Sequence, residues 1–129
     1  MRAALWPDAD PQELADEFDT LLADDDQVAF VAEGPNGRLC GFIEASVRPW
    51  AEGVNEHPCA FIEGWWVDED VRRTGIGRAL VQIVEAWARG RGFTELGSDA
   101  ELHNKLSLRA HEALGFEERQ RTVWFRKKL

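Results

Sequence analysis

The chain has 129 residues, 44% hydrophobic and 30% charged, which is the composition of a soluble globular domain, and we expect one domain over 1–129. A formal net charge of −9 argues against a nucleic-acid partner, because neutralising phosphates requires a basic surface. No apolar run approaches the ~20 residues that span a bilayer, and no signal-peptide pattern opens the chain, so we expect a cytoplasmic protein without a membrane partner.

The first half of the chain predicts a helix followed by strands. Apolar residues at helical spacing predict a helix over 11–23, with Asp10 as its N-cap. The turn sequence at 34–37 predicts a hairpin between the first two strands. Three segments have the composition of strands: 28–32, 38–47 and 59–67.

The second half alternates helices and strands. We expect helices over 76–90 and 104–114, with Gly115 as the C-cap of the second. Short strands are expected at 93–97 and 122–126. This order predicts an α/β layer structure. Cys40 and Cys59 lie in strand-like sequence outside any Cys/His cluster, so we expect buried reduced thiols and no metal site.

Charge is unevenly distributed along the chain. Residues 8–26 contain seven Asp and two Glu without a Lys or Arg. If these acids line a cleft, they attract a cationic ligand. The alternative is that they only keep the surface solvated.

An R-x-x-G-x-G loop at 72–77 joins the strand at 59–67 to the following helix. Unpaired backbone N–H groups and the positive end of a helix dipole converge at such a junction, and a pyrophosphate requires both. Many strand-to-helix turns use glycine with nothing bound, so the loop by itself leaves an ordinary turn open.

A second block, Asn104-x-x-Ser107-x-x-x-His111-x-x-Leu114-Gly115-Phe116, follows about thirty residues later. With both blocks in this order, the chain resembles the GCN5-related N-acetyltransferase (GNAT) superfamily. The resemblance implies the GNAT fold, an α/β (α+β) structure with a mixed central sheet flanked by helices. Family members usually begin with a strand and most of a helix before the position of Met1, so the first strand is expected to be absent here.

The resemblance implies acetyl-CoA as co-substrate. The end of the strand would pair with the pantetheine arm, the loop amides would hold the pyrophosphate, and the amide of the second block would contact the cofactor. The residues concerned are Trp65, Trp66, Val67, Arg73, Thr74, Gly75, Ile76, Gly77, Arg78 and Asn104.

Within this superfamily the chain is most similar to aminoglycoside 6′-N-acetyltransferases. The resemblance implies a cationic aminoglycoside as substrate, antibiotic resistance as the outcome and a homodimer. This resemblance rests on four short sequence segments: Leu5-Trp6-Pro7 before an acidic helix, Ala45-Ser46-Val47-Arg48 followed by Trp50, Phe61-Ile62-Glu63-Gly64, and Ser98-Asp99 ahead of Asn104.

Two carboxylates are candidate site residues. Glu63 lies among apolar residues, where an acid is costly unless it is paired or protonated, so it is either an ammonium ligand or an outward-facing strand residue. Asp99 follows a short strand and either caps the next helix or binds substrate. The resemblance favours substrate binding for both, and a carboxylate can accept the proton of the attacking amine.

Three further residues complete the candidate site. Trp6 and Trp50 lie in loop-like sequence, where flat faces either stack on sugar rings or pack in the core; the resemblance favours recognition. His111 occupies the position where many family members have a tyrosine that protonates the departing thiolate. Imidazole can do the same near neutral pH, or His111 can simply pack on its helix.

Two rival functions remain open on the sequence. The same chemistry could act on a polyamine, an amino acid or a protein N-terminus. A non-catalytic acyl-CoA-binding module is the other alternative, because the usual tyrosine is missing.

Overall fold

The computed structural model describes residues 1–129, which form two compact units, Met1–Ser98 and Asp99–Leu129. The first unit contains a four-stranded sheet in the order β1-β2-β3-β4. Adjacent strands are antiparallel from β1 to β3, whereas β3 and β4 are parallel, so the expected mixed sheet is confirmed. The strands are β1 (Gln27–Glu33), β2 (Leu39–Arg48), β3 (Cys59–Val67) and β4 (Leu96–Gly97).

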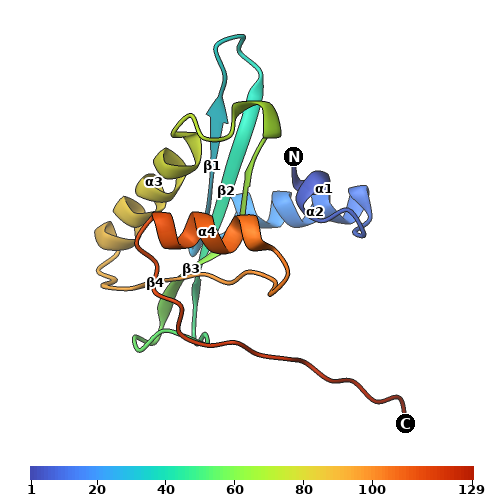
Figure 1. Ribbon diagram of the computed structural model, residues 1–129, viewed down its shortest axis with the longest axis vertical. Helices are drawn as coiled ribbons and strands as arrows, with labels where there is room; N and C mark the ends of the chain where they lie inside the picture. Colours follow the sequence, from blue (N-terminus) through green and yellow to red (C-terminus); the bar gives the residue numbers. More distant parts are fainter. The chain divides into compact units, whose positions relative to one another are not determined.

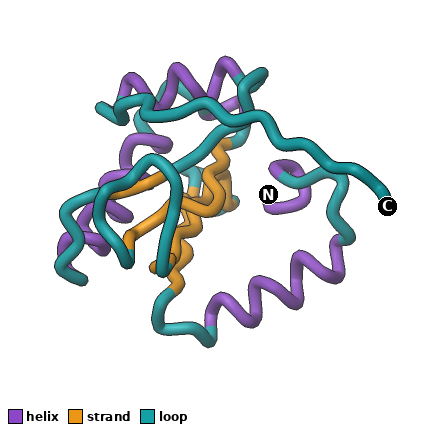
Figure 2. The backbone as a smooth tube through the Cα atoms, turned by 90° about the horizontal axis from the view of Figure 1, so that it is seen from below, coloured by secondary structure: helices purple, strands orange, loops and turns teal.

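Helices cover both faces of this sheet (Figures 1 and 2). A Cβ added at Gly41 would meet Ile76 and Leu80 of α3, whereas the neighbouring Phe42 ring lies 6.3 Å from the Trp6 ring. Successive side chains of a strand point to opposite faces, so α3 lies on one face and α1 and α2 lie on the other. The helices of this unit are α1 (Arg2–Leu5), α2 (Pro11–Leu22), the 3-10 turn η1 (Glu69–Val71) and α3 (Ile76–Gly90).

Local sequence explains where α2 and α3 form. Asp10 caps α2 as expected, and its carboxylate accepts hydrogen bonds from the backbone N–H groups of Gln12 and Glu13. No helix in the chain is long and apolar enough to cross a membrane. The helix α3 buries one apolar stripe against the sheet. The buried residues of that stripe are Leu80, Val81, Val84 and Ala88.

The expected strand at 93–97 is shorter than predicted, because other groups use its first amides. The Glu56 carboxylate accepts hydrogen bonds from the N–H groups of Thr94 and Glu95, at 2.9 and 3.2 Å. Only Leu96 and Gly97 pair with β3. The short helix α1 was not predicted. Cys40 and Cys59 are buried free thiols, as expected, and burial raises the pKa of Cys59.

The second unit contains α4 (Lys105–Ala113), close to the prediction, and Gly115 follows it with φ +87°. The strand expected at 122–126 is wrong for this structure, because residues 115–129 contain no strand. A strand requires a hydrogen-bonded neighbour, and no strand of this chain pairs with that segment. Trp124 and Phe125 are instead 90% and 92% exposed.

Candidate active site

Glu63 lies at a β-bulge in β3. Glu44 of β2 lies opposite Gly64, whereas the next residue, Ala45, lies opposite Ile62. Glu63 is therefore the extra residue of β3 and has no partner in the register. A bulge of this kind bends its strand and redirects a side chain, and bulges are frequent beside active sites.

The Glu63 carboxylate is held by two neighbours on β2. Arg48 donates from Nε to Oε1 at 2.7 Å and from Nη2 to Oε2 at 2.5 Å. The Ser46 hydroxyl donates to Oε1 at 2.5 Å. Burial raises the pKa of Glu63, but the hydrogen bonds from Arg48 and Ser46 outweigh it, and the pKa lies below its usual value of 4.5. Glu63 is thus a half-buried carboxylate that stays ionised at neutral pH.

Trp6 lies at the C-terminal end of α1 and packs onto this bulge. A Cβ added at Gly64 would lie 2.6 Å from Cη2 and 2.9 Å from Cζ2 of the indole, so the ring occupies the space of the missing side chain. Trp6 and Glu63 line the same cleft, whose volume is ≈ 370 Å³. Trp6 is therefore half-buried on the sheet rather than carried on a free loop, and one part of it faces the cleft.

Trp50 is 58% exposed, in the loop between β2 and β3, and its ring stacks on that of His57 with centroids 5.9 Å apart. The end of this loop is fastened by the Glu95 carboxylate, which accepts hydrogen bonds from the N–H groups of Asn55 and Glu56 at 2.7 and 3.0 Å. Trp50 thus presents an exposed aromatic ring on an anchored loop.

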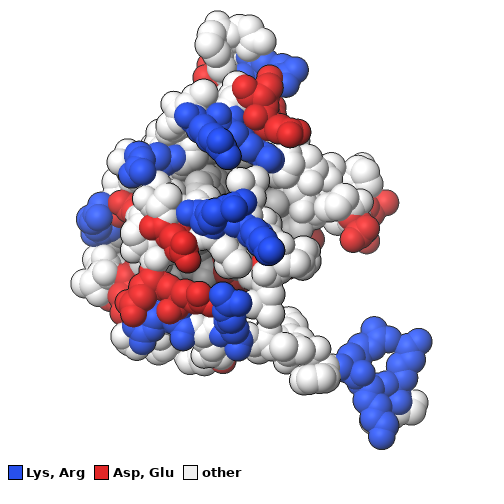
Figure 3. Space-filling view, in the orientation of Figure 1, with Lys and Arg blue, Asp and Glu red and all other residues white.

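The glycine loop has the conformation expected of an anion site. Gly75 has φ +91° and is the N-cap of α3, with no side-chain cap. A Cβ added there would meet nothing within 4 Å, so this side of Gly75 faces open space. Arg73 also has a positive φ, of 64°. In the orientation of Figure 3, basic and acidic side chains lie side by side over the segment between β3 and α3, which includes Arg72 and Arg73. Exposed helix N–H groups, open space and nearby guanidinium groups together suit a pyrophosphate.

The two glycines of the loop have different roles. Gly75 supplies a left-handed backbone, whereas a Cβ at Gly77 would lie 3.1 Å from Cζ2 of Trp65. Trp65 therefore supports the first turn of α3. Trp66 anchors the other end of the loop, because its Nε1 donates to Asp68 at 2.9 Å and the Arg72 guanidinium lies 5.1 Å from its ring centroid.

The second unit holds the remaining candidates. Asn104 is the N-cap of α4, and its Oδ1 accepts a hydrogen bond from the N–H of Ser107 at 3.1 Å. Asp99 therefore does not cap this helix, and that alternative is excluded. His111 Nδ1 lies 2.7 Å from the Ser107 carbonyl oxygen, and the His111 ring packs edge-on against Phe116.

Sequence reasoning missed the polar residues around the bulge. The cleft is also lined by Arg2, Glu17 and Glu44, and Glu44 is 2% exposed. Glu44 lies in an otherwise apolar run of β2, and a buried acid of this kind requires a partner. That signal was readable in the sequence, but the identity of the partner was not, because it lies 42 positions away.

Known proteins support the likeness to acetyltransferases. The model of the acetyltransferase (GNAT) family matches residues 1–116. An aminoglycoside N(6′)-acetyltransferase type 1 of Klebsiella aerogenes is 44% identical over 132 residues, covering 100% of this chain and 87% of the relative. One of Stenotrophomonas maltophilia is 39% identical, covering 100% of this chain and 84% of the relative.

Solved structures agree in fold. AAC(6′)-Iy in complex with the bisubstrate analog CoA-S-monomethyl-acetylneamine has a TM-score of 0.92 at 32% identity, covering 100% of this chain and 88% of that one. AAC(6′)-Ih from Acinetobacter baumannii has a TM-score of 0.89 at 38% identity, covering 99% and 87%. Sequence and fold together identify the chain as a member of the acetyltransferase (GNAT) family.

Proposed function

We propose that this acetyltransferase transfers the acetyl group of acetyl-CoA to the 6′-amine of an aminoglycoside and so confers resistance to it. The observation that carries the proposal is the cleft that both the Trp6 indole and the ionised Glu63 carboxylate line. An amino sugar can stack its ring on the flat Trp6 indole and place an ammonium group beside the Glu63 carboxylate. The relatives named above are aminoglycoside acetyltransferases, which supports this choice of acceptor.

The substrate's ammonium groups meet acidic side chains on the protein. A carboxylate has about four acceptor positions, and Arg48 and Ser46 use three on Glu63, which leaves one on Oε2 for an ammonium. The acidic stretch at 8–26 strengthens the attraction for a polycation. Trp6 and Trp50 flank the sugar rings.

The reaction is a direct transfer. The neutral amine attacks the thioester carbon, an N–C bond forms, the C–S bond breaks, and the thiolate leaves. A carboxylate accepts the proton of the amine, directly or through a water. The lowered pKa of Glu63 suits an ammonium ligand better than a base, so we assign proton acceptance first to Asp99. We assign protonation of the thiolate to His111.

The first unit seats acetyl-CoA through its loop and the end of β3. Amides of residues 73–78 hold the pyrophosphate, and the backbone of Trp65, Trp66 and Val67 pairs with the pantetheine arm. Gly75, with open space over it and no side-chain cap, supports this assignment. We also assign Asn104 to cofactor binding, and we take residues 1–129 as one functional domain.

A homodimer and a cytoplasmic location belong to the same proposal. The exposed apolar side chains of Val123, Trp124 and Phe125 support self-association. Light scattering at micromolar concentration tests it: we expect twice the monomer mass, and a lower mass after Trp124→Lys.

One assay tests the acceptor. Purified protein with acetyl-CoA, a thiol reagent and kanamycin-type drugs should release CoA. Release with spermidine or peptides but with no 6′-amino drug would reject the aminoglycoside and favour another amine. No release with any amine would leave a non-catalytic acyl-CoA-binding module. Glu63→Gln and Asp99→Asn should each lower turnover or drug affinity.

A further inference from the structure

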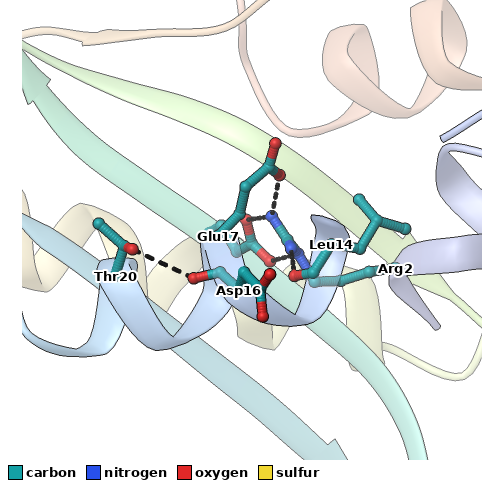
Figure 4. Close-up of polar contacts among 6 residues, drawn as sticks. Arg2, Leu14, Asp16, Glu17 and Thr20 are labelled. Carbon is teal, nitrogen blue, oxygen red and sulfur yellow. Dashed lines mark hydrogen bonds and ion pairs between the residues drawn. The ribbon is translucent and has the colours of Figure 1, made fainter. Parts of the chain in front are cut away.

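The most connected side chain in the cleft is Arg2 of α1, which the proposed chemistry does not use. Its Nε donates to Oε1 of Glu44 at 2.7 Å, its Nη2 donates to Oε2 at 3.3 Å, and its Nη1 donates to the Leu14 carbonyl oxygen. Nη2 also lies 3.5 Å from a Glu17 oxygen. Figure 4 shows this guanidinium reaching the carbonyl of Leu14 and the Glu17 side chain of α2. One side chain thus connects α1, α2 and β2.

The same guanidinium lies over the Trp6 ring, with Cζ 5.0 Å from the ring centroid. The far edge of the indole meets the backbone at Gly64, and Gly64 lies opposite Glu44 in the sheet register. Four residues therefore form a ring in which each one neighbours the next: Arg2, Trp6, Gly64 and Glu44. Because Arg2 is only 18% exposed on its side chain, water competes little for these contacts.

We propose that Arg2 is a positioning residue for substrate recognition: held by Glu44, its guanidinium fixes the Trp6 indole against Gly64, next to Glu63. The inference rests on the proposed function, because it takes Trp6 as a surface for the sugar ring. A planar guanidinium is suited to this role, since its fork binds a carboxylate in its own plane while its face covers an aromatic ring. The competing interpretation is that the Arg2–Glu44 pair only fastens α1 to the sheet.

Arg2→Lys separates the two interpretations. Lysine keeps the positive charge beside Glu44, but an ammonium cannot reach both Glu44 oxygens and lie flat on the indole. We expect KM for the aminoglycoside to rise about tenfold, with kcat and KM for acetyl-CoA within about twofold of wild type. A merely structural role would lower Tm without changing the KM of the folded enzyme. Arg89→Lys is the matched control, because Arg89 pairs with Glu85 on the exposed surface of α3.

A second readout needs no substrate. The tryptophan emission spectrum of Arg2→Lys should differ from wild type, and the difference should vanish when both proteins also carry Trp6→Phe. If Arg2→Lys does not fold, Glu44→Gln loosens the same guanidinium without changing side-chain size, and KM should rise in the same direction.

The outcomes distinguish the two proposals. Turnover by the wild type with an unchanged KM in Arg2→Lys and Glu44→Gln would overturn the positioning role alone. An altered Trp6 emission with an unchanged KM would also overturn it, because the indole would then move without consequence. Failure of the wild type to acetylate any aminoglycoside would overturn the proposed function and this inference with it.

Discussion

Replacing Gly64 with alanine tests the placement of Trp6 most directly. The new Cβ would lie 2.6 Å from Cη2 of the indole, about 0.8 Å short of the 3.4 Å at which ordinary contact begins. The backbone at Gly64 has no positive φ, so the substitution acts through this contact rather than through backbone strain. Overpacking of this kind lowers the free energy of unfolding by about 2 kcal/mol, which corresponds to a fall in Tm of roughly 6–10 °C for a domain of this size.

The displaced ring should also weaken substrate recognition, and we expect KM for the aminoglycoside to rise at least about tenfold. Thermal unfolding and steady-state kinetics measure the two effects. Gly90→Ala is the control, since a Cβ there meets nothing within 4 Å, and it should leave stability unchanged or slightly higher. In a Trp6→Leu background the added methyl has room, so Gly64→Ala should cost little further stability. An equal loss in both backgrounds, or no loss in either, would refute the reasoning.

Three further predictions concern the loop, the ion pair and the first long helix. Gly75→Ala forces alanine to φ +91°, and we expect it to lower the free energy of unfolding by about 1 kcal/mol. The substitution should also raise KM for acetyl-CoA but not for the amine. An unchanged KM for acetyl-CoA would remove Gly75 from the cofactor site. Glu63 has a lower pKa in the folded state than its usual 4.5, so its stabilisation is fully present above that pH and is lost as pH falls through the folded pKa. The difference in unfolding free energy between wild type and Glu63→Gln should therefore be constant near neutral pH and shrink in acid; a constant difference throughout would contradict the shift. Asp10→Ala removes the α2 cap and should lower the unfolding free energy by about 1 kcal/mol with kcat unchanged, measured by urea unfolding and turnover.

Local sequence predicted most of the fold. Period-2 and period-3.6 patterns located the strands β1 to β3 and the helices α2, α3 and α4 to within a few residues, and Asp10 marked the start of α2. The failure near the C-terminus has a physical cause. The segment at 122–126 has strand composition, but a strand forms only when another strand is available to pair with it.

The candidate site was predicted in part. The loop at 72–77 and Glu63 could be found because glycine spacing and an acid in an apolar run are local signals. The roles of Asp99, Asn104 and His111 rest on resemblance, and the structure adds only their local contacts, such as the capping of α4 by Asn104.

Local sequence was enough to identify most of the helices and strands in their order, the glycine loop and the family, because each of these is encoded by residues close together in the chain. The contacts between side chains that are distant in the sequence became known only from the folded structure. It placed the Trp6 indole on the bare backbone of Gly64, Arg2 against Glu44 and Arg48 against Glu63. Their pairing depends on a bulge and on the packing of α1 over the sheet, and no local pattern specifies contacts between residues tens of positions apart.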